Sequence, residues 1–270
     1  SNAVRDLERE MGIDIFIRNP KGITLTKDGV EFLSYARQVV EQTNLLEERY
    51  KSHTETRELF SVSSQHYAFV VNAFVSLLKR ADMTRYELFL RETRTYEIIE
   101  DVKNFRSEIG VLFLNGYNRD VLTKMFDDNR LTYTSLFKAR PHIFVSKSNP
   151  LAKHKVVSLE DLEDFPYLSY DQGIHNSFYY SEEILSQIPH KKSIVVSDRA
   201  TLFNLLIGLD GYTIATGILN SNLNGDNIVS IPLDVDDEID IVYLKHEKAT
   251  LSKMGEKFLD NLVKEVTFDN

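Results

Sequence analysis

The sequence contains no cysteine and no apolar stretch long enough to cross a membrane. The absence of cysteine excludes disulfides, thiolate metal sites, iron–sulfur clusters and a cysteine nucleophile. A membrane-spanning helix needs about 20 apolar residues, and no secretory signal opens the chain. We therefore expect a soluble, cytoplasmic protein.

Signatures of catalysis and of cofactor binding are also missing. The chain has neither a Gly-x-Ser-x-Gly motif nor a glycine-rich phosphate loop. Its seven histidines show no close metal-ligand spacing; they are His53, His66, His142, His154, His175, His190 and His246. We therefore expect no catalytic residue, no metal and no cofactor.

What is present is an ordinary globular composition. Of the 270 residues, 42% are apolar and 27% are charged, so the chain can fold around a substantial core. A chain of this length is expected to form two or more domains. The net charge of −9 argues against broad affinity for nucleic acid, but it does not exclude one small DNA-contacting module.

The N-terminal region has the pattern of a small winged structure. Residues 1–12 place apolar side chains on one helical face, and Gly12 is suited to end that helix. Two short strands follow around a turn at residues 19–22. Thr26 is then placed to cap the next helix.

That next helix, over about residues 27–56, carries an apolar seam with a seven-residue repeat. The seam consists of Phe32, Ala36, Val39, Thr43, Leu46 and Tyr50. We predict that it forms a dimer interface. The alternative is packing against the C-terminal part of the same chain.

From residue 59 onward, strands and helices alternate. The predicted strands are 59–64, 86–92, 108–114, a pair at 131–137 and 142–146, then 167–170, 193–197, 211–216, 228–233 and 239–245. The predicted helices are 67–80, 95–105, 176–187, 199–209 and 251–266, with a helical turn from Ser158 that ends at Pro166. This alternation predicts an α/β protein with open parallel sheets covered by helices. The number of strands favours two lobes.

Residues 1–29 resemble the second half of the winged helix-turn-helix of LysR-type transcriptional regulators, a bacterial family. The positions that match the family pattern are Ser1, Val4, Leu7, Glu8, Met11, Gly12, Phe16, Arg18, Leu25, Thr26 and Gly29. Ile15 departs from the leucine usual before Phe16. The resemblance continues weakly through the long helix, the Ser158–Pro166 segment and the strand that starts at Gly211.

The resemblance implies a domain organisation. Residues 1–27 would be a partial DNA-binding domain, residues 28–57 a linker and dimerisation helix, and residues 58–270 a periplasmic-binding-protein-like effector domain. Lobe I would comprise about 58–137 and 235–270, and lobe II about 138–234. Two helices of the family's DNA-binding domain have no counterpart, and Ser1-Asn2-Ala3 is typical of a tag-cleavage scar. We therefore expect a fragment that binds operator DNA weakly or not at all.

Four cations are candidates for DNA contact in the full-length protein. Arg18 and Lys21, at the hairpin tip, resemble the wing residues of the family and are suited to phosphates. Arg5 and Arg9 lie on the exposed face of the first helix. The alternative is that all four are ordinary solvated surface charges.

A ligand cleft is expected between the lobes, because α/β proteins bind ligands at the carboxyl ends of their strands. This rule selects Ser63, Ser64, Gln65, His66, Thr93, Arg94, Thr95, Asn115, Tyr170, Asp171, Ser197, Thr201 and Thr216 as effector-binding candidates. Such side chains suit a small, polar, carboxylate or amino-acid-like effector. Serine and threonine here could instead merely cap helices, and Arg94 could pair with Glu92 or Glu97.

The resemblance thus implies a transcriptional regulator that binds operator DNA and a coinducer, forms a homodimer or homotetramer, and is not an enzyme. Two other classes remain as alternatives. A solute-binding protein of a transport system would share the two-lobed cleft but would be a monomer. An enzyme would need a nucleophile or an acid–base pair, and none is evident.

Overall fold

The computed structural model describes residues 2–20, 22–51, 58–80, 85–219 and 226–267. The chain divides into two compact units, Ser1–Arg57 and Glu58–Asn270. Within the described residues, no helix is long and apolar enough to cross a membrane.

The first unit has the predicted order of elements. It consists of α1 (Asn2–Met11), β1 (Phe16–Asn19), β2 (Gly22–Leu25) and α2 (Lys27–Lys51), and the two strands form an antiparallel hairpin. Gly12 ends α1 with a left-handed φ of 67°, as expected. Thr26 caps α2 by accepting a hydrogen bond from the Gly29 amide at 2.7 Å. The predicted continuation of α2 to residue 56 lies outside the described residues.

Ile15 is the buried centre of this small unit, with 3% of its surface exposed. The side chain of Glu8 holds the segment around it, because Oε1 accepts hydrogen bonds from the amides of Ile15 at 2.9 Å and Phe16 at 3.0 Å. Gly29 packs directly on Ile15, since a Cβ at position 29 would lie 2.1 Å from the Ile15 carbonyl oxygen.

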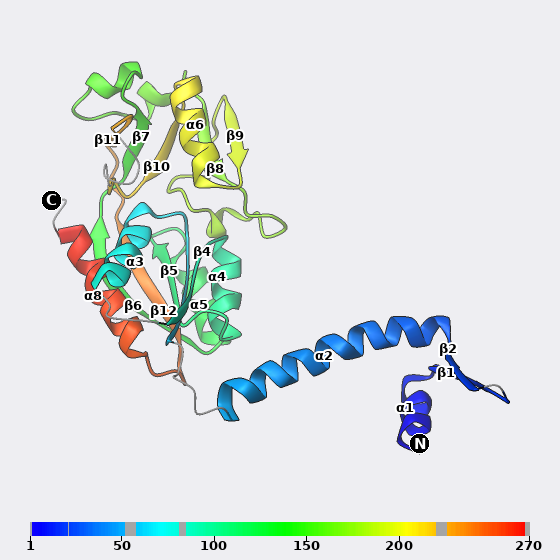
Figure 1. The fold of residues 1–270 in the computed structure, drawn as a ribbon. Coiled ribbons are helices and arrows are strands. Elements are labelled where there is room, and N and C mark those ends of the chain that lie inside the picture. The colour runs from blue at the N-terminus through cyan, green and yellow to red at the C-terminus, as the bar shows by residue number, and fades with distance from the viewer. Residues whose placement is uncertain (1, 21, 52–57, 81–84, 220–225, 268–270) are drawn as a thin grey trace. The chain divides into compact units, whose positions relative to one another are not determined.

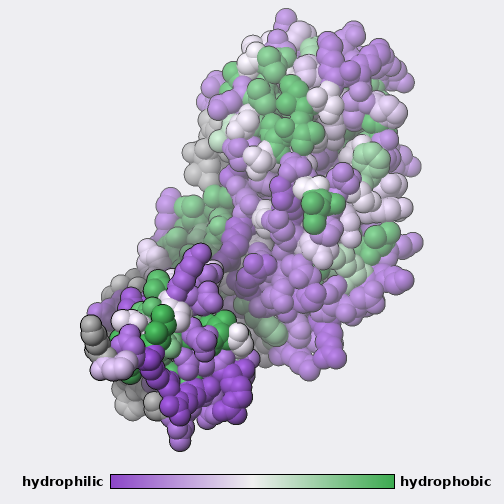
Figure 2. Space-filling model, turned by 90° about the vertical axis from the view of Figure 1, so that its right-hand side faces the viewer, coloured by the Kyte–Doolittle hydropathy of each residue, from purple (hydrophilic) through white to green (hydrophobic). Residues whose placement is uncertain are grey.

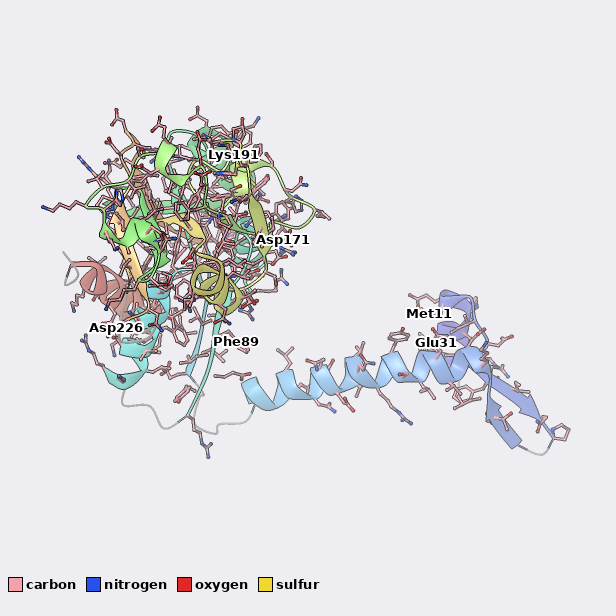
Figure 3. The ribbon with its side chains drawn as sticks, turned by 90° about the horizontal axis from the view of Figure 1, so that it is seen from above. Met11, Glu31, Phe89, Asp171, Lys191 and Asp226 are labelled. Atoms are coloured by element: carbon pink, nitrogen blue, oxygen red, sulfur yellow. The ribbon has the colours of Figure 1, made fainter. Side chains whose placement is uncertain are left out.

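The apolar seam of α2 is largely uncovered in the single chain. Val39 is 66% exposed and Leu46 is 58% exposed, while Phe32 and Ala36 are half-buried. Side chains project from all sides of this helix in Figure 3. The side chain of Tyr50, the last residue of the seam, lies outside the described residues.

The second unit contains two five-stranded sheets (Figure 1). We call the first sheet and its helices the first lobe; its strand order is β4-β3-β5-β12-β6. These strands are β3 (Glu58–Ser64), β4 (Tyr86–Glu92), β5 (Ile109–Leu114), β6 (Leu131–Ala139) and β12 (Ile239–His246). The helices are α3 (Ala68–Arg80), α4 (Thr95–Lys103), α5 (Arg119–Asp128) and α8 (Lys253–Thr267).

The first lobe has three layers, with the sheet between two layers of helices. Strand β5 shows this arrangement, because every one of its residues is buried. Val111 and Phe113 belong to the core formed with α3 and α8, whereas Leu112 and Leu114 belong to the core formed with α4 and α5. Successive side chains of a strand point to opposite faces, so both faces of the sheet are covered by helices.

The second lobe comprises the other sheet, in the order β11-β7-β10-β8-β9, with its helices. Its strands are β7 (His142–Ser146), β8 (Tyr167–Tyr170), β9 (Ser193–Val196), β10 (Tyr212–Ala215) and β11 (Ile228–Pro232). Helix α6 (Arg199–Leu209) packs on this sheet through Leu202 and Leu206. Short 3-10 turns lie at η1 (Pro150–Lys153), η2 (Glu160–Leu162) and η3 (Phe178–Tyr180).

The structure corrects the predicted pairing of the strands. Neither sheet is wholly parallel, because β12 runs antiparallel to β5 and β6, and β7 runs antiparallel to β10 and β11. The predicted pair at 131–137 and 142–146 does not pair, since β6 and β7 belong to different sheets. The connections β6–β7 and β11–β12 therefore carry the chain from one lobe to the other.

Two helix predictions were also wrong. The segment 176–187 contains only η3 and turns, because Leu185 adopts a left-handed φ of 62° and Glu182 bonds to another segment. Conversely, α5 occupies residues for which no helix was predicted. Its Leu122 and Phe126 are fully buried beneath polar neighbours.

Surface hydrophobicity on the molecule is patchy rather than continuous. Figure 2 shows apolar patches set among hydrophilic residues on one face. In the second unit, Phe89 of β4 is 42% exposed and Val195 of β9 is 60% exposed. Both strands are sheet edges.

Candidate functional site

The two lobes meet where β3, β4 and β5 end in the first lobe and where β8 and β10 end in the second. A cavity of about 50 Å³ lies at this junction. Its walls are mainly apolar and aromatic, including Phe69, Phe113, Phe144, Tyr170, Phe203 and Ile214. The charged residues on its lining are His66, Glu182, Glu183 and Arg199.

His66 and Glu182 join the lobes at the cavity wall. The carboxylate Oε2 of Glu182 accepts hydrogen bonds from the His66 amide at 2.9 Å and pairs with the imidazole Nδ1 at 2.8 Å. The His66 ring stacks on Tyr170 at a centroid distance of 4.0 Å. Burial lowers the pKa of His66, but the hydrogen bond and negative charge of Glu182 outweigh this effect, so the pKa is raised from 6.5.

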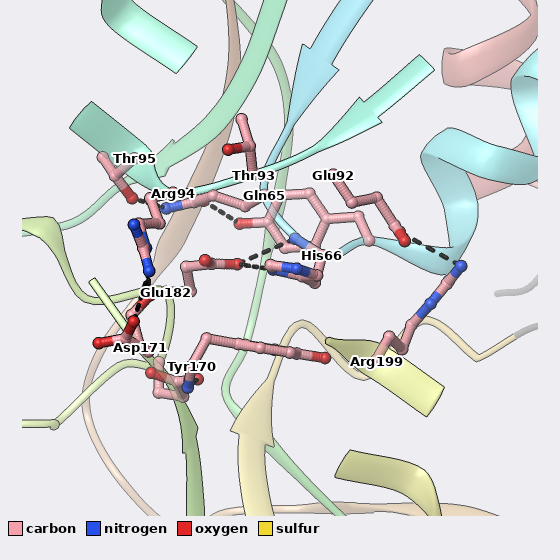
Figure 4. Close-up of polar contacts among 12 residues, drawn as sticks. Gln65, His66, Glu92, Thr93, Arg94, Thr95, Tyr170, Asp171, Glu182 and Arg199 are labelled. Carbon is pink, nitrogen blue, oxygen red and sulfur yellow. Dashed lines mark hydrogen bonds and ion pairs between the residues drawn. The ribbon is translucent and has the colours of Figure 1, made fainter. Parts of the chain in front are cut away.

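A second connection between the lobes involves Arg94 (Figure 4). Its Nη2 donates to Asp171 Oδ2 at 2.5 Å, and its Nε donates to the Asp171 carbonyl oxygen at 3.1 Å. Gly173 allows this approach, because a Cβ there would lie 2.8 Å from Arg94 Nη1. The amide of Thr95 donates to Gln172 Oε1 at 3.1 Å. The start of α4 is thus bonded to the segment after β8.

Glu92 and Arg199 form a third connection. The Arg199 guanidinium at the start of α6 lies 3.2 Å from Glu92 Oε1 at the end of β4. Burial raises the pKa of Glu92, and the positive charge of Arg199 partly offsets this. The three ion pairs cross the cleft at different points (Figure 4), so they hold the two lobes together around the cavity.

Glu183 differs from its neighbour Glu182. Only 4% of its surface is exposed, and its Oε1 accepts a hydrogen bond from the Tyr170 amide at 2.8 Å. Among the described residues, no ion pair involves Glu183. Burial, followed by the charge of Glu182, raises the pKa of this carboxyl well above its ordinary value.

Three of the effector-binding candidates from the sequence line the cavity: His66, Tyr170 and Thr216. Arg94, Thr95 and Asp171 lie beside it and take part in the bonds between the lobes. Gln65 is fully buried; it donates to Thr95 Oγ1 at 2.7 Å and accepts from the Phe113 amide at 3.1 Å. It therefore fixes the ends of the strands beneath the cleft.

The remaining candidates do not line the cavity. Ser63 Oγ donates to Asp101 Oδ2 at 2.6 Å, behind the cleft, whereas Ser64 Oγ is buried without a partner. Thr93 bonds to Glu97, and Asn115 organises the turn after β5. Ser197 is exposed.

Thr201 has the bonds of a helix cap, which was the alternative to a ligand contact for serine and threonine. Its amide and hydroxyl both donate to Asp198, which caps α6.

Sequence reasoning missed Glu92, Glu182, Glu183 and Arg199 as cleft residues. The available signal was the pair of adjacent acidic residues directly before the apolar Ile184-Leu185. The predicted helix at 176–187 gave no reason to place this pair in the cleft. Within the described residues, no group of three potential metal-binding side chains occurs.

The candidate DNA-contacting residues lie in the first unit. Arg5 is exposed, and Arg9 pairs with Asp6 at 2.5 Å. Arg18 is on the hairpin, and its Nη2 lies 3.5 Å from Oε2 of Glu8 in α1. Lys21 falls outside the described residues.

Comparisons with known proteins identify relatives. Residues 63–267 match the family described as LysR substrate binding domain. The HTH-type transcriptional regulator YvbU of Bacillus subtilis is 25% identical over 185 residues, which are 66% of this chain and 58% of that protein. The transcriptional dual regulator GltC of the same organism is 26% identical over 180 residues, which are 64% and 55% of the two chains. The chain thus spans little more than half the length of these relatives.

Solved structures share the fold. A full-length OxyR variant from Pseudomonas aeruginosa matches with a TM-score of 0.54 at 15% identity, covering 97% of this chain and 88% of that one. An OxyR mutant from Corynebacterium glutamicum matches with a TM-score of 0.56 at 13% identity, covering 99% and 82%. The family match covers about three quarters of this chain, and the two-lobed α/β architecture agrees with it. The chain therefore belongs to the LysR substrate-binding-domain family.

Proposed function

We propose that this chain is the effector-sensing part of a LysR-type transcriptional regulator that acts in the cytoplasm. Residues 1–27 form part of a winged helix-turn-helix, residues 28–57 form the linker and dimerisation helix, and residues 58–270 form the effector domain. In the effector domain, lobe I comprises about 58–137 and 235–270, and lobe II about 138–234. The names of the relatives, which are transcriptional regulators, support this assignment.

The observation that carries the proposal is the cavity between the lobes, closed by ion pairs that join opposite walls. A small molecule that enters it changes the relative stability of the closed and open arrangements. A ligand shifts such an equilibrium only by its differential affinity for the two states. The effector domain then passes this shift to the DNA-binding part of the full-length protein.

The effector is a small metabolite, a carboxylate or an amino-acid-like compound. The charged groups on the cavity lining supply its polar contacts, and the aromatic walls cover its apolar part. The partners of the full-length protein are operator DNA and further copies of the same chain, as a homodimer or a homotetramer. A solute-binding protein and an enzyme remain the alternatives, and the names of the relatives favour neither.

The test couples two measurements. Thermal-shift screening of amino acids and carboxylates against the 270-residue chain first identifies a ligand; one present at 100 times its dissociation constant adds about 2.7 kcal/mol of stability. The affinity of the full-length protein for its operator is then measured with and without that ligand. The ligand changes DNA affinity, and DNA changes ligand affinity by the same factor.

The matched variant is Thr216→Val, which removes a hydroxyl from the cavity lining while nearly preserving volume. We expect weaker ligand binding with the same fold, whereas Thr201→Val at the exposed cap of α6 leaves ligand affinity unchanged. Turnover of the ligand, or a ligand that leaves DNA affinity unaltered, contradicts the proposal.

A further inference from the structure

Glu183 is the carboxyl of the cleft that lacks a positive partner. The other acidic groups at the junction each face a cation: Glu182 pairs with His66, Glu92 with Arg199, and Asp171 with Arg94. Glu183 lines the cavity with 4% of its surface exposed, and no ion pair among the described residues reaches it. Backbone amides of Tyr170, Glu182 and Glu183 donate hydrogen bonds to this carboxyl, but burial still disfavours its ionised form, and a cation would offset that cost.

The walls around Glu183 are suited to a cation. Six aromatic residues line the same cavity: Tyr67, Phe69, Phe113, Phe144, Tyr170 and Phe203. The face of an aromatic ring attracts a positive charge, and cages of aromatic side chains are used to bind ammonium groups. The aromatic lining and the unpaired carboxyl are independent features of the cavity, and both favour the same kind of ligand.

The cations of the cavity favour this ligand over a simple anion. His66 and Arg199 are the basic side chains on the lining, and each already faces a carboxylate, at 2.8 Å and 3.2 Å respectively. A plain carboxylate ligand would therefore have to displace Glu182 or Glu92 to gain a positive partner. A ligand with an ammonium group needs no such displacement.

The volume of the cavity limits the size of the ligand. A dry cavity of about 150 Å³ holds a benzene ring, whereas the present cavity measures about 50 Å³. The cavity in its closed arrangement therefore suits a short aliphatic group rather than an aromatic one.

Building on the function proposed above, we infer that the cleft selects an effector that carries a primary ammonium group on a short aliphatic body, with the ammonium held between Glu183 and the aromatic walls. Amino acids and simple amines share this chemistry. Among the two ligand classes considered above, a carboxylate without an amine is excluded.

Protonation provides a second signature of this site. The titratable groups that influence Glu183 are Glu182, Tyr67, Tyr167 and Tyr170, and the cations on the same lining, His66 and Arg199, each face another carboxylate. Burial and the charge of Glu182 raise the pKa of Glu183, and hydrogen bonds from backbone amides partly offset this effect. An ammonium group binds the ionised carboxylate better than the protonated one, so we expect affinity for the amine to rise as rising pH ionises Glu183.

The experiment compares three ligands that differ by one group each. Glycine carries both an amine and a carboxylate, methylamine has the amine alone, and acetate has the carboxylate alone. Binding of each to the 270-residue chain is measured by thermal shift and by calorimetry. We expect glycine and methylamine to bind and acetate not to bind.

The variant Glu183→Gln keeps the acceptor for the Tyr170 amide but removes the charge. We expect its affinity for the amines to fall about tenfold or more, as for loss of a hydrogen bond to a charged group. Glu163→Gln, which breaks the exposed pair with Lys191 in the same lobe, is the matched control and leaves affinity unchanged. If Glu183→Gln does not fold, the pH dependence of binding to the wild-type chain decides the matter: affinity for the amine, measured by calorimetry below the pKa of the amine itself, is expected to rise with pH.

The inference and the proposed function fail differently. Stronger binding of acetate than of the amines, unchanged affinity in folded Glu183→Gln, or amine affinity that does not rise with pH overturns the inference and leaves the effector function standing. If neither these ligands nor any amino acid or carboxylate of the wider screen binds, both are overturned.

Discussion

The guanidinium of Arg94 and the side chain of Asp171 connect the two lobes through a contact that is open to solvent. The bond from Nη2 to Oδ2 measures 2.5 Å, but the two side chains are 38% and 41% exposed. Exposed ion pairs contribute little, about 0.2–1 kcal/mol. The contact therefore fixes the position of one lobe against the other more than it adds to stability.

Replacing Asp171 by Asn is expected to lower the free energy of unfolding by less than about 1 kcal/mol at neutral pH. The pKa of Asp171 is lowered by the hydrogen bond from the Gly173 amide and by Arg94. A lowered pKa means that the stabilisation is present above about pH 4 and is lost as the pH falls through the folded-state value.

Urea titrations of the wild type and Asp171→Asn at pH 7 and pH 3 measure this difference, which should shrink at pH 3. The control Glu163→Gln breaks an exposed pair within the second lobe alone. An Asp171→Asn difference that grows in acid would show that the sign of the pKa shift is wrong.

The adjacent residues Ser63 and Ser64 are expected to respond oppositely to substitution by alanine. Ser63→Ala removes a hydroxyl bonded to the buried Asp101 at 2.6 Å and to Ser107 at 2.7 Å. It should destabilise the chain by about 1–3 kcal/mol. Ser64→Ala removes a buried hydroxyl without a partner, so it should be neutral or slightly stabilising. Chemical denaturation of both variants tests the pair, and equal losses would contradict the observed bonding.

The His66–Glu182 pair should make stability depend on pH. Because the folded-state pKa of His66 is raised above 6.5, its contribution is complete below about pH 6.5 and is lost as the pH rises through the folded value. Glu182→Gln should remove this loss and lower the His66 pKa, since burial and the charge of Arg199 are then opposed only by the charge of Glu92. Nuclear magnetic resonance titration of the histidine ring protons measures the change. His190, whose pKa is lowered by burial, is the internal control and should not move.

Two glycines offer a matched test of packing. Gly29→Ala places a Cβ 2.1 Å from the Ile15 carbonyl oxygen, whereas nothing lies within 4 Å of a Cβ at Gly208. The first variant should destabilise its unit by about 1–3 kcal/mol. The second should stabilise α6 by about 0.5 kcal/mol through better helix propensity. Hydrogen-exchange rates of the α2 amides in Gly29→Ala and of the α6 amides in Gly208→Ala measure the two effects separately. Faster exchange of the α6 amides in Gly208→Ala would contradict the predicted stabilisation.

The seam of α2 makes a prediction about association. If the seam forms the dimer interface, Val39→Asp puts like charges opposite each other there and should raise the dimer dissociation constant about 100-fold or more. Gln38→Asp adds the same charge beside the seam and should have little effect. Sedimentation equilibrium of the two variants decides; equal association would place the interface elsewhere.

The elements that could be predicted are those in which burial determines the pattern. Strand β5 is apolar at every position and buried at every position, and the apolar face of α3 recurs in the core. The direction of a strand cannot be predicted from an apolar pattern. The apolar residues of β12 are buried as expected for a strand, but they do not indicate that the strand runs antiparallel between β5 and β6.

The place of the candidate site could be predicted, but the orientation of each side chain in it could not. The rule that ligands lie beyond strand ends led to His66, Tyr170 and Thr216, all on the cavity lining. It could not show that Ser63 turns away to Asp101. The carboxyls Glu182 and Glu183 escaped notice because tertiary contacts, rather than local periodicity, determine their conformation.

The placement of β12 has a consequence for how the chain is made. This strand lies between β5 and β6 in the sheet of the first lobe and pairs with both, yet it is formed by residues 239–246, which follow all the strands of the second lobe. While the ribosome is still translating the second lobe, β5 and β6 lack the strand that joins them. A nascent chain released before this point cannot complete its first lobe, although most of that lobe has already been synthesised.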